Sequence, residues 1–191
     1  MKRAAIALVL VLAGCAQQDL TLVSEADLPS DVYGPPRPTP SQPAIPANGR
    51  IFFVTRARLE PMTLDLQPVL DSVPEALLVA LFQGPQRDIS TEVPEGTRLN
   101  GVQVAGGIAT IDVSGDFERA APPRSQALRI AQVVYTLTDP KNETGIQGVR
   151  FQIDGVPQEA IGGEQLGTIP GPVTRADYER FVPRERDRPS P

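Results

Sequence analysis

Apolar residues form short blocks along the second quarter of the chain, and their spacing predicts two strands. Residues 51–54 are apolar without interruption, which is typical of a strand buried on both faces. In residues 58–66 leucines alternate around Asp65, which predicts a second strand, antiparallel to the first. Pro61 places this second strand near a sheet edge, because proline donates no hydrogen bond to a neighbouring strand.

A helix is predicted to begin at Ser72-Val73-Pro74-Glu75. Ser72 can cap the first turn, Pro74 suits that turn, and Glu75 stands three residues on to complete a capping box. Leucines and a phenylalanine then form one apolar stripe. Gly84, followed by proline, ends the helix.

A second, stronger helix is predicted over residues 126–138, with Ser125 as its N-cap. Isoleucine, valine and leucine residues recur on one face of this segment. The helix should stop at Asp139, because a residue that precedes proline avoids the α region. Residues 174–181 carry a weaker signal for a short helix.

Two further strands should surround a tight turn. Residues 98–104 and 108–113 flank Gly106 and Gly107, which supply the positive φ angles of a hairpin turn. Gly101 interrupts the first arm and marks a bulge. Residues 149–154 alternate as a half-buried strand that ends in turn chemistry.

The resulting order is β-β-α-β-β-α-β, and we predict an α+β fold. We expect a single compact domain, with a mostly antiparallel sheet and two main helices packed on one face. The domain with its C-terminal extension covers residues 49–182, and residues 183–191 are expected to be disordered.

The N-terminus has the pattern of a bacterial lipoprotein signal. Lys2 and Arg3 precede an apolar run over residues 4–12, and small residues lead to Cys15, the single cysteine. The run is too short to span a bilayer, which takes about 20 residues. We therefore expect cleavage after residue 14 and acyl chains, such as palmitate, on Cys15. The alternative is a plain signal peptide with a coincidental cysteine.

Residues 15–48 follow as the lipidated N-terminus and a proline-rich segment without hydrophobic period. Prolines disfavour a helix and favour an extended chain, so the segment is interpreted as a spacer that holds the domain away from the membrane. It can equally be a generic disordered lead-in, and the two interpretations are compatible.

Composition excludes several classes of function. The chain lacks histidine, which removes Ser-His-Asp catalysis and the usual zinc ligands, so we expect no catalytic residue, no metal site and no cofactor. After loss of residues 1–14, 16 basic and 23 acidic residues remain, a net charge of −7. Such a chain is a poor candidate for nucleic-acid binding.

Five motifs resemble the GerMN domain, the sporulation and spore-germination module, and they occur in the order of that family. They cover residues 75–85, 93–97, 107–117, 130–138 and 149–155. The resemblance implies an extracytoplasmic α/β module without known enzymatic activity, usually in lipoproteins or membrane-anchored proteins. It also implies that self-association or docking to other envelope proteins is plausible. One branch of the family carries a C-terminal propeller and assists a two-component sensor.

Carboxylates offer one candidate chemistry. Asp112, Asp116 and Glu118, with Glu75, suggest acid-base catalysis or a divalent ion. Asp112 lies on the solvent side of an alternating strand, however, and the next two acids lie in a turn. A role in solvated loops is the better interpretation. A carboxylate-dependent cell-wall hydrolase stays as the less favoured alternative.

Gln132, Tyr135 and Thr136 form the second candidate group, on the flank of the second helix. Buried polar groups there need hydrogen-bond partners. We expect them to fix this helix to the end of the strand that carries Asp112, or to form a surface for a partner.

Together these observations predict a non-enzymatic binding or scaffold module. It should be anchored by lipid at Cys15 on the extracytoplasmic face of the cell membrane. Expected partners are the membrane, through the anchor, and an envelope protein or a peptidoglycan-associated component. An accessory role beside an envelope-sensing two-component system is the main alternative.

Overall fold

The structure, a computed structural model, describes residues 46–66, 72–85, 89–161 and 167–183. Cys15, the predicted signal and most of the spacer lie outside these residues, as does the tail from residue 184. The described elements, with η for 3-10 helices, are β1 (Asn48–Thr55), β2 (Arg58–Asp65), α1 (Val73–Phe82), β3 (Leu99–Ala105), β4 (Ile108–Val113), η2 (Gly115–Glu118), α2 (Pro123–Leu137), η3 (Pro140–Asn142), β5 (Gly148–Ile153), β6 (Val156–Gln158), β7 (Ala160–Ile161), β8 (Thr168–Ile169) and η4 (Arg175–Phe181).

The predicted α+β class is confirmed, as is the dominance of antiparallel pairing. The described strands form three sheets, ordered β1-β2, β3-β4-β5-β6 and β7-β8. Every pair of neighbouring strands is antiparallel except β4 and β5, which run parallel. A parallel pair needs a long crossover connection, and α2 supplies it.

The β1–β2 hairpin forms as predicted. Residues 51–54 are at most 3% exposed, in agreement with an apolar block that is buried on both faces. Arg56 and Ala57 make the turn with φ angles of 49° and 58°. Pro61 lies in β2, which has β1 as its partner within the described sheets.

Helix α1 begins and ends where the sequence predicts. The Glu75 N–H donates to Ser72 Oγ at 3.3 Å, and proline occupies the first turn. The apolar stripe is buried, with Leu77, Leu78 and Leu81 each at 0% exposure. Burying a leucine side chain contributes about 1.5–3 kcal/mol, so this face holds the helix against the core.

The β3–β4 hairpin also follows the prediction. Gly106 and Gly107 take φ angles of 56° and 76° between the strands. A register shift between Leu99 and Gly101 is the predicted bulge. Along β4 alternate residues are fully buried, and they face the core with alternate residues of β5.

The predicted start of the second helix is wrong. Helix α2 begins at Pro123, and Pro122 occupies the N-cap position without a side-chain hydrogen bond. Ser125 therefore lies inside the first turn instead of capping it. The reason is that proline already has the helical φ and needs no N–H donor in the first turn, so Pro123 extends the helix. The short helix η4 forms as predicted, with a capping box between Thr174 and Asp177.

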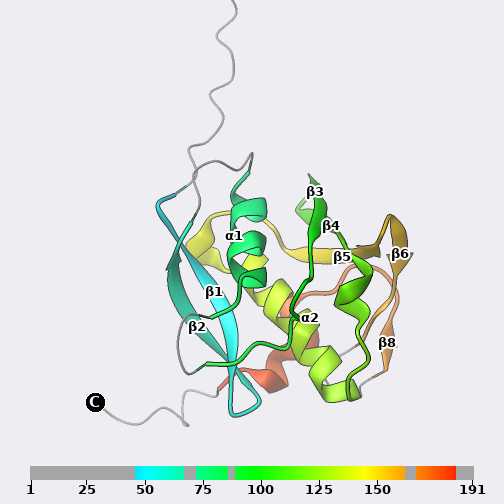
Figure 1. Ribbon diagram of the computed structural model, residues 1–191. Helices are drawn as coiled ribbons and strands as arrows, with labels where there is room; N and C mark the ends of the chain where they lie inside the picture. Colours follow the sequence, from blue (N-terminus) through cyan, green and yellow to red (C-terminus); the bar gives the residue numbers. More distant parts are fainter. Residues whose placement is uncertain (1–45, 67–71, 86–88, 162–166, 184–191) are drawn as a thin grey trace, which may run out of the picture. The chain divides into compact units, whose positions relative to one another are not determined.

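Helix α2 is the centre of the described domain. Figure 1 shows it between the β1–β2 hairpin and the β3–β6 sheet, and it contacts both. Eleven of its residues are buried, and they include polar and charged side chains. In the part of the chain that the structure describes, no helix is long and apolar enough to cross a bilayer.

Candidate functional site

The free edge of β1 faces α2, and polar side chains satisfy its backbone. The edge residues are Arg50, Phe52 and Val54, whose N–H and C=O groups point away from β2. A buried strand edge without partners would leave costly unpaired groups. We call the contacts that close this edge the polar seam.

Two side chains of α2 pair with Phe52 in the polar seam. The Phe52 N–H donates to Thr136 Oγ1 at 3.0 Å, and Gln132 Nε2 donates to the Phe52 carbonyl at 3.1 Å. Gln132 Oε1 also accepts from the Glu92 N–H at 2.8 Å. The two side chains therefore replace a neighbouring strand at this point.

The ends of the polar seam are closed by residues outside α2. Asn142 pairs with Arg50 through both amide atoms: Oδ1 accepts from the Arg50 N–H and Nδ2 donates to the Arg50 carbonyl, each at 2.8 Å. Ser90 exchanges two backbone hydrogen bonds with Val54, at 2.8 and 3.0 Å. Neither Asn142 nor Ser90 is identifiable from the sequence, because Asn142 ends a three-residue 3-10 helix and Ser90 forms an isolated β-bridge, and both are too short for a periodic pattern.

The α2 residues that were expected to fix the helix or to meet a partner lie at the polar seam. Gln132 and Thr136 are 0% exposed, so they offer no surface to a partner and instead hold α2 to β1. Tyr135 packs edge-on against Phe52, and its hydroxyl donates to the Arg175 carbonyl at 3.1 Å. Burial raises the pKa of Tyr135.

Asp112 does not join this group, contrary to the expectation. It lies on β4, in a different sheet, and its carboxylate accepts from the Gly155 N–H at 2.9 Å. The reason is topological: α2 packs beside β1, and the end of β4 meets the β5–β6 turn. Asp116 instead pairs with Arg119 at 3.3 Å on the surface.

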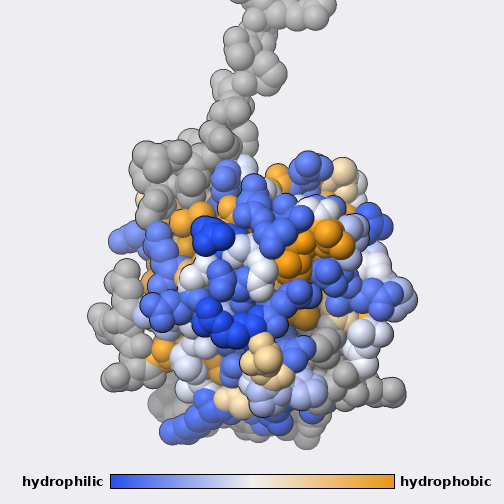
Figure 2. Space-filling view, turned by 45° about the vertical axis from the view of Figure 1, so that its right-hand side comes forward, coloured by the Kyte–Doolittle hydropathy of each residue, from blue (hydrophilic) through white to orange (hydrophobic). Residues whose placement is uncertain are grey.

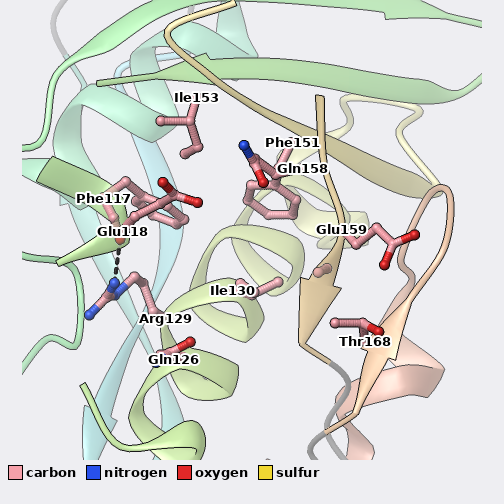
Figure 3. Close-up of a pocket in the computed structure, with 11 residues that line it drawn as sticks. Phe117, Glu118, Gln126, Arg129, Ile130, Phe151, Ile153, Gln158, Glu159 and Thr168 are labelled. Atoms are coloured by element: carbon pink, nitrogen blue, oxygen red, sulfur yellow. Dashed lines mark hydrogen bonds between the residues drawn. The ribbon is translucent and has the colours of Figure 1, made fainter. Parts of the chain in front are cut away.

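A hollow of about 280 Å³ opens between α2, η2 and the strands β5–β8. Figure 3 shows its lining, in which the Phe117 and Phe151 rings stack with centroids 5.9 Å apart. Ile130 and Ile153 add apolar surface. We call it the Phe151 hollow. Its rim is polar and is formed by Glu118, Gln126, Gln158, Glu159 and Thr168.

Arg129 closes one end of the Phe151 hollow, and its guanidinium is already occupied. It is 5% exposed. Its Nε donates to the Glu92 carbonyl at 2.8 Å, and its terminal nitrogens donate to the carbonyls of Phe117 and Arg119. Burial lowers the pKa of Arg129. This arginine joins η2 to α2. The sequence signal that could have identified it is a charged residue among the apolar residues of the helix.

The Phe151 hollow suits a small apolar group more than acid-base chemistry. Glu118 and Glu159 are exposed and stand on opposite sides of it in Figure 3. Among the described residues, no group of three or more acidic, cysteine or histidine side chains is placed to hold a metal ion. Figure 2 shows hydrophobic residues gathered among hydrophilic ones on the side where the β3–β6 sheet lies.

The described part of the chain is thus a small α+β domain with a helix joined by side chains to a strand edge. The chain belongs to the Germane family, described as sporulation and spore germination, whose model matches residues 50–159. The resemblance seen in the sequence is therefore confirmed. No curated protein matches the chain.

Solved structures of GerMN domains share this fold. One contains the tandem GerMN domains of the sporulation protein GerM from Bacillus subtilis, with 19% identity and a TM-score of 0.53. The match covers 68% of this chain and 46% of that one, so it spans about half of the tandem protein. The first GerMN domain of GerM alone gives 20% identity and a TM-score of 0.52, with 68% and 98% covered.

Proposed function

We propose that this protein is a lipid-anchored, non-enzymatic binding module on the extracytoplasmic face of the cell membrane. The observation that carries the proposal is the order of its parts: a lipoprotein-type signal that ends at Cys15, a proline-rich spacer and one sporulation-type domain. A tethered domain of this kind acts by contact. Its structure supports binding, because open depressions, among them one of about 280 Å³ and one of about 880 Å³, lie between its elements.

The partner we propose is an envelope protein or a component associated with peptidoglycan. Pairing of two copies through β2 is disfavoured by Pro61. Phe52, opposite Pro61, directs its N–H and C=O to α2, so this pair carries no ladder bonds and the Pro61 ring faces the outer edge. Proline at that position blocks strand addition. An accessory role beside a two-component sensor remains the alternative within the same class.

A carboxylate-dependent wall hydrolase is less well supported. Sugar hydrolysis needs two carboxyl groups facing each other at about 5–10 Å across the scissile bond. Asp112 is engaged by a backbone N–H and Asp116 by Arg119. Release of soluble fragments from purified peptidoglycan by the pure chain would favour the hydrolase over the binding module.

Membrane fractionation tests the anchor. The Cys15→Ala variant should leave the membrane fraction, while a Ser24→Ala variant in the spacer should stay in it. Crosslinking on intact cells, followed by purification, should then enrich defined envelope proteins over an anchor-only control. A Cys15→Ala protein that still sediments with membranes would contradict the anchor, and recovery equal to the control would contradict the binding role.

A further inference from the structure

A large depression between described residues is basic, although the chain as a whole is acidic. It has an open volume of about 880 Å³ and lies between the β1–β2 turn, η3 and η4. Five cations and two carboxylates line it, in a chain whose net charge is −5. The cations are Arg50, Arg56, Arg58, Lys141 and Arg175, and we call this depression the basic groove.

Two of these arginines are held in place but are not saturated. Arg50 and Arg175 each lie 3.8 Å from the same Asp139 oxygen, and both guanidinium groups stack near the Phe52 ring, at 5.5 and 5.6 Å. A separation of 3.8 Å is an ion pair without a direct hydrogen bond. Arg175 Nη1 also donates to the Tyr135 carbonyl at 3.3 Å. The side chains of Arg50 and Arg175 are 28% and 35% exposed, and each guanidinium has five N–H donors, so donors remain available to a ligand.

Two further cations of the basic groove are accessible to a ligand. Arg56, in the β1–β2 turn, and Lys141, in η3, are exposed and line the groove. Arginine presents a planar set of donors that matches carboxylates, and lysine adds a compact charge.

We propose that the basic groove binds an acidic peptide segment of a protein partner. Positive charge alone would also attract a phosphodiester polymer. The lining, however, interleaves the cations with the apolar surfaces of Pro61, Pro140, Val182 and Pro183. A peptide can place apolar side chains between its carboxylates, whereas a phosphodiester polymer offers none. Recognition of acidic motifs by arginine clusters is a recurrent binding mode. This inference deepens the proposed binding role but is independent of the lipid anchor.

Fluorescence anisotropy tests the proposal on the full chain in nonionic detergent at low salt. The probe is a labelled peptide of alternating glutamate and valine, and the matched probe has glutamine in place of glutamate. The Arg56→Glu/Lys141→Glu variant should bind the acidic probe at least about tenfold more weakly. The Arg98→Glu/Arg150→Glu control changes the net charge equally at exposed sites outside the groove lining, and should lose less than about twofold.

Three results would overturn the proposal. The first is equal loss of affinity in both double variants with unchanged thermal unfolding, and the second is equal binding of the glutamine probe. The third is groove-dependent binding of poly(glycerol phosphate) that is tighter than binding of the acidic probe. Added salt should weaken the interaction, because exposed charges are screened. Loss of membrane anchoring in Cys15→Ala would leave all these outcomes unchanged, so the two proposals fail separately.

Discussion

The Phe151 hollow and the basic groove both contain arginine, yet the arginines are in opposite states. Arg129 at the hollow is buried and donates to the carbonyls of three residues. Arg50 and Arg175 at the groove are partly exposed and share one carboxylate at a distance without direct hydrogen bonds. The presence of arginine therefore says little about binding until its donors are accounted for.

The same comparison distinguishes polar residues that stabilise the domain from polar residues that can bind a ligand. Polar groups that are saturated by the backbone, such as Arg129 and the residues of the polar seam, stabilise the fold. Polar groups with remaining donors lie at the basic groove. The domain thus has a mainly apolar hollow with two glutamates on its rim and, between other elements, a cationic groove.

Removing the saturated arginine should give the largest effect on stability. Arg129→Met keeps much of the side-chain volume but leaves three carbonyl groups without their donor. We expect the free energy of unfolding to fall by about 2–4 kcal/mol. Urea denaturation followed by circular dichroism measures it. Arg150→Met at an exposed strand position should stay within about 0.5 kcal/mol, and equal losses in the two variants would contradict the assignment.

The polar seam extends the comparison to uncharged groups. Gln132→Leu should lower the free energy of unfolding by about 2–3 kcal/mol, because the Phe52 carbonyl and the Glu92 N–H both lose a buried partner. Gln103→Leu makes the same chemical change at an exposed position of β3. A Gln132→Leu protein as stable as this control would show that the polar seam does not hold α2 to β1.

Asp139 neutralises part of the positive charge in the basic groove. Its replacement should therefore increase the difference in anion binding between the groove and the Phe151 hollow. In Asp139→Asn the amide keeps the shape but no longer competes for Arg50 and Arg175. Affinity for the glutamate–valine probe should rise by about two- to fivefold, a modest gain because the two arginines are partly exposed to solvent. Anisotropy titration measures this change. Unchanged or weaker binding by folded Asp139→Asn would show that this carboxylate does not compete with the ligand.

The smallest expected effect is a pH dependence at the alkaline end. Burial raises the pKa of Tyr135 and of Tyr178, whereas the pKa of a tyrosine in the unfolded chain is about 10. The folded chain then retains protons that the unfolded chain has lost. The stabilisation that these two tyrosines provide is therefore fully present below about pH 10 and is lost as the pH rises further. Tyr135→Phe/Tyr178→Phe should flatten this fall in urea titrations, and a slope identical to that of the unsubstituted protein would contradict the prediction.

Local chemistry made much of the fold predictable. Ser72 with Pro74, the Gly106-Gly107 pair and the uninterrupted apolar block of residues 51–54 each specify their own element. Their physical signals lie within a few residues. The start of α2 was missed because Ser125 is a good N-cap, but two preceding prolines let the helix begin earlier.

The site was less predictable because its contacts join distant segments. Gln132 and Thr136 were recognised as polar groups in need of partners, but the partner, β1, lies 80 or more residues away in sequence. Arg50 and Arg175, 125 residues apart in sequence, meet at Asp139 and the Phe52 ring. One usable signal was overlooked: Arg50, Arg56 and Arg58 crowd around a single hairpin of an otherwise acidic chain.

The most direct test of where the domain binds is a titration of the isotope-labelled full chain with the glutamate–valine peptide, followed by amide chemical shifts. The account predicts shifts that grow with peptide concentration at Arg56, Lys141 and Arg175, around the basic groove. Amides of Ile130 and Phe151 at the Phe151 hollow should remain unchanged. Shifts confined to the hollow, with none at the groove, would contradict the account.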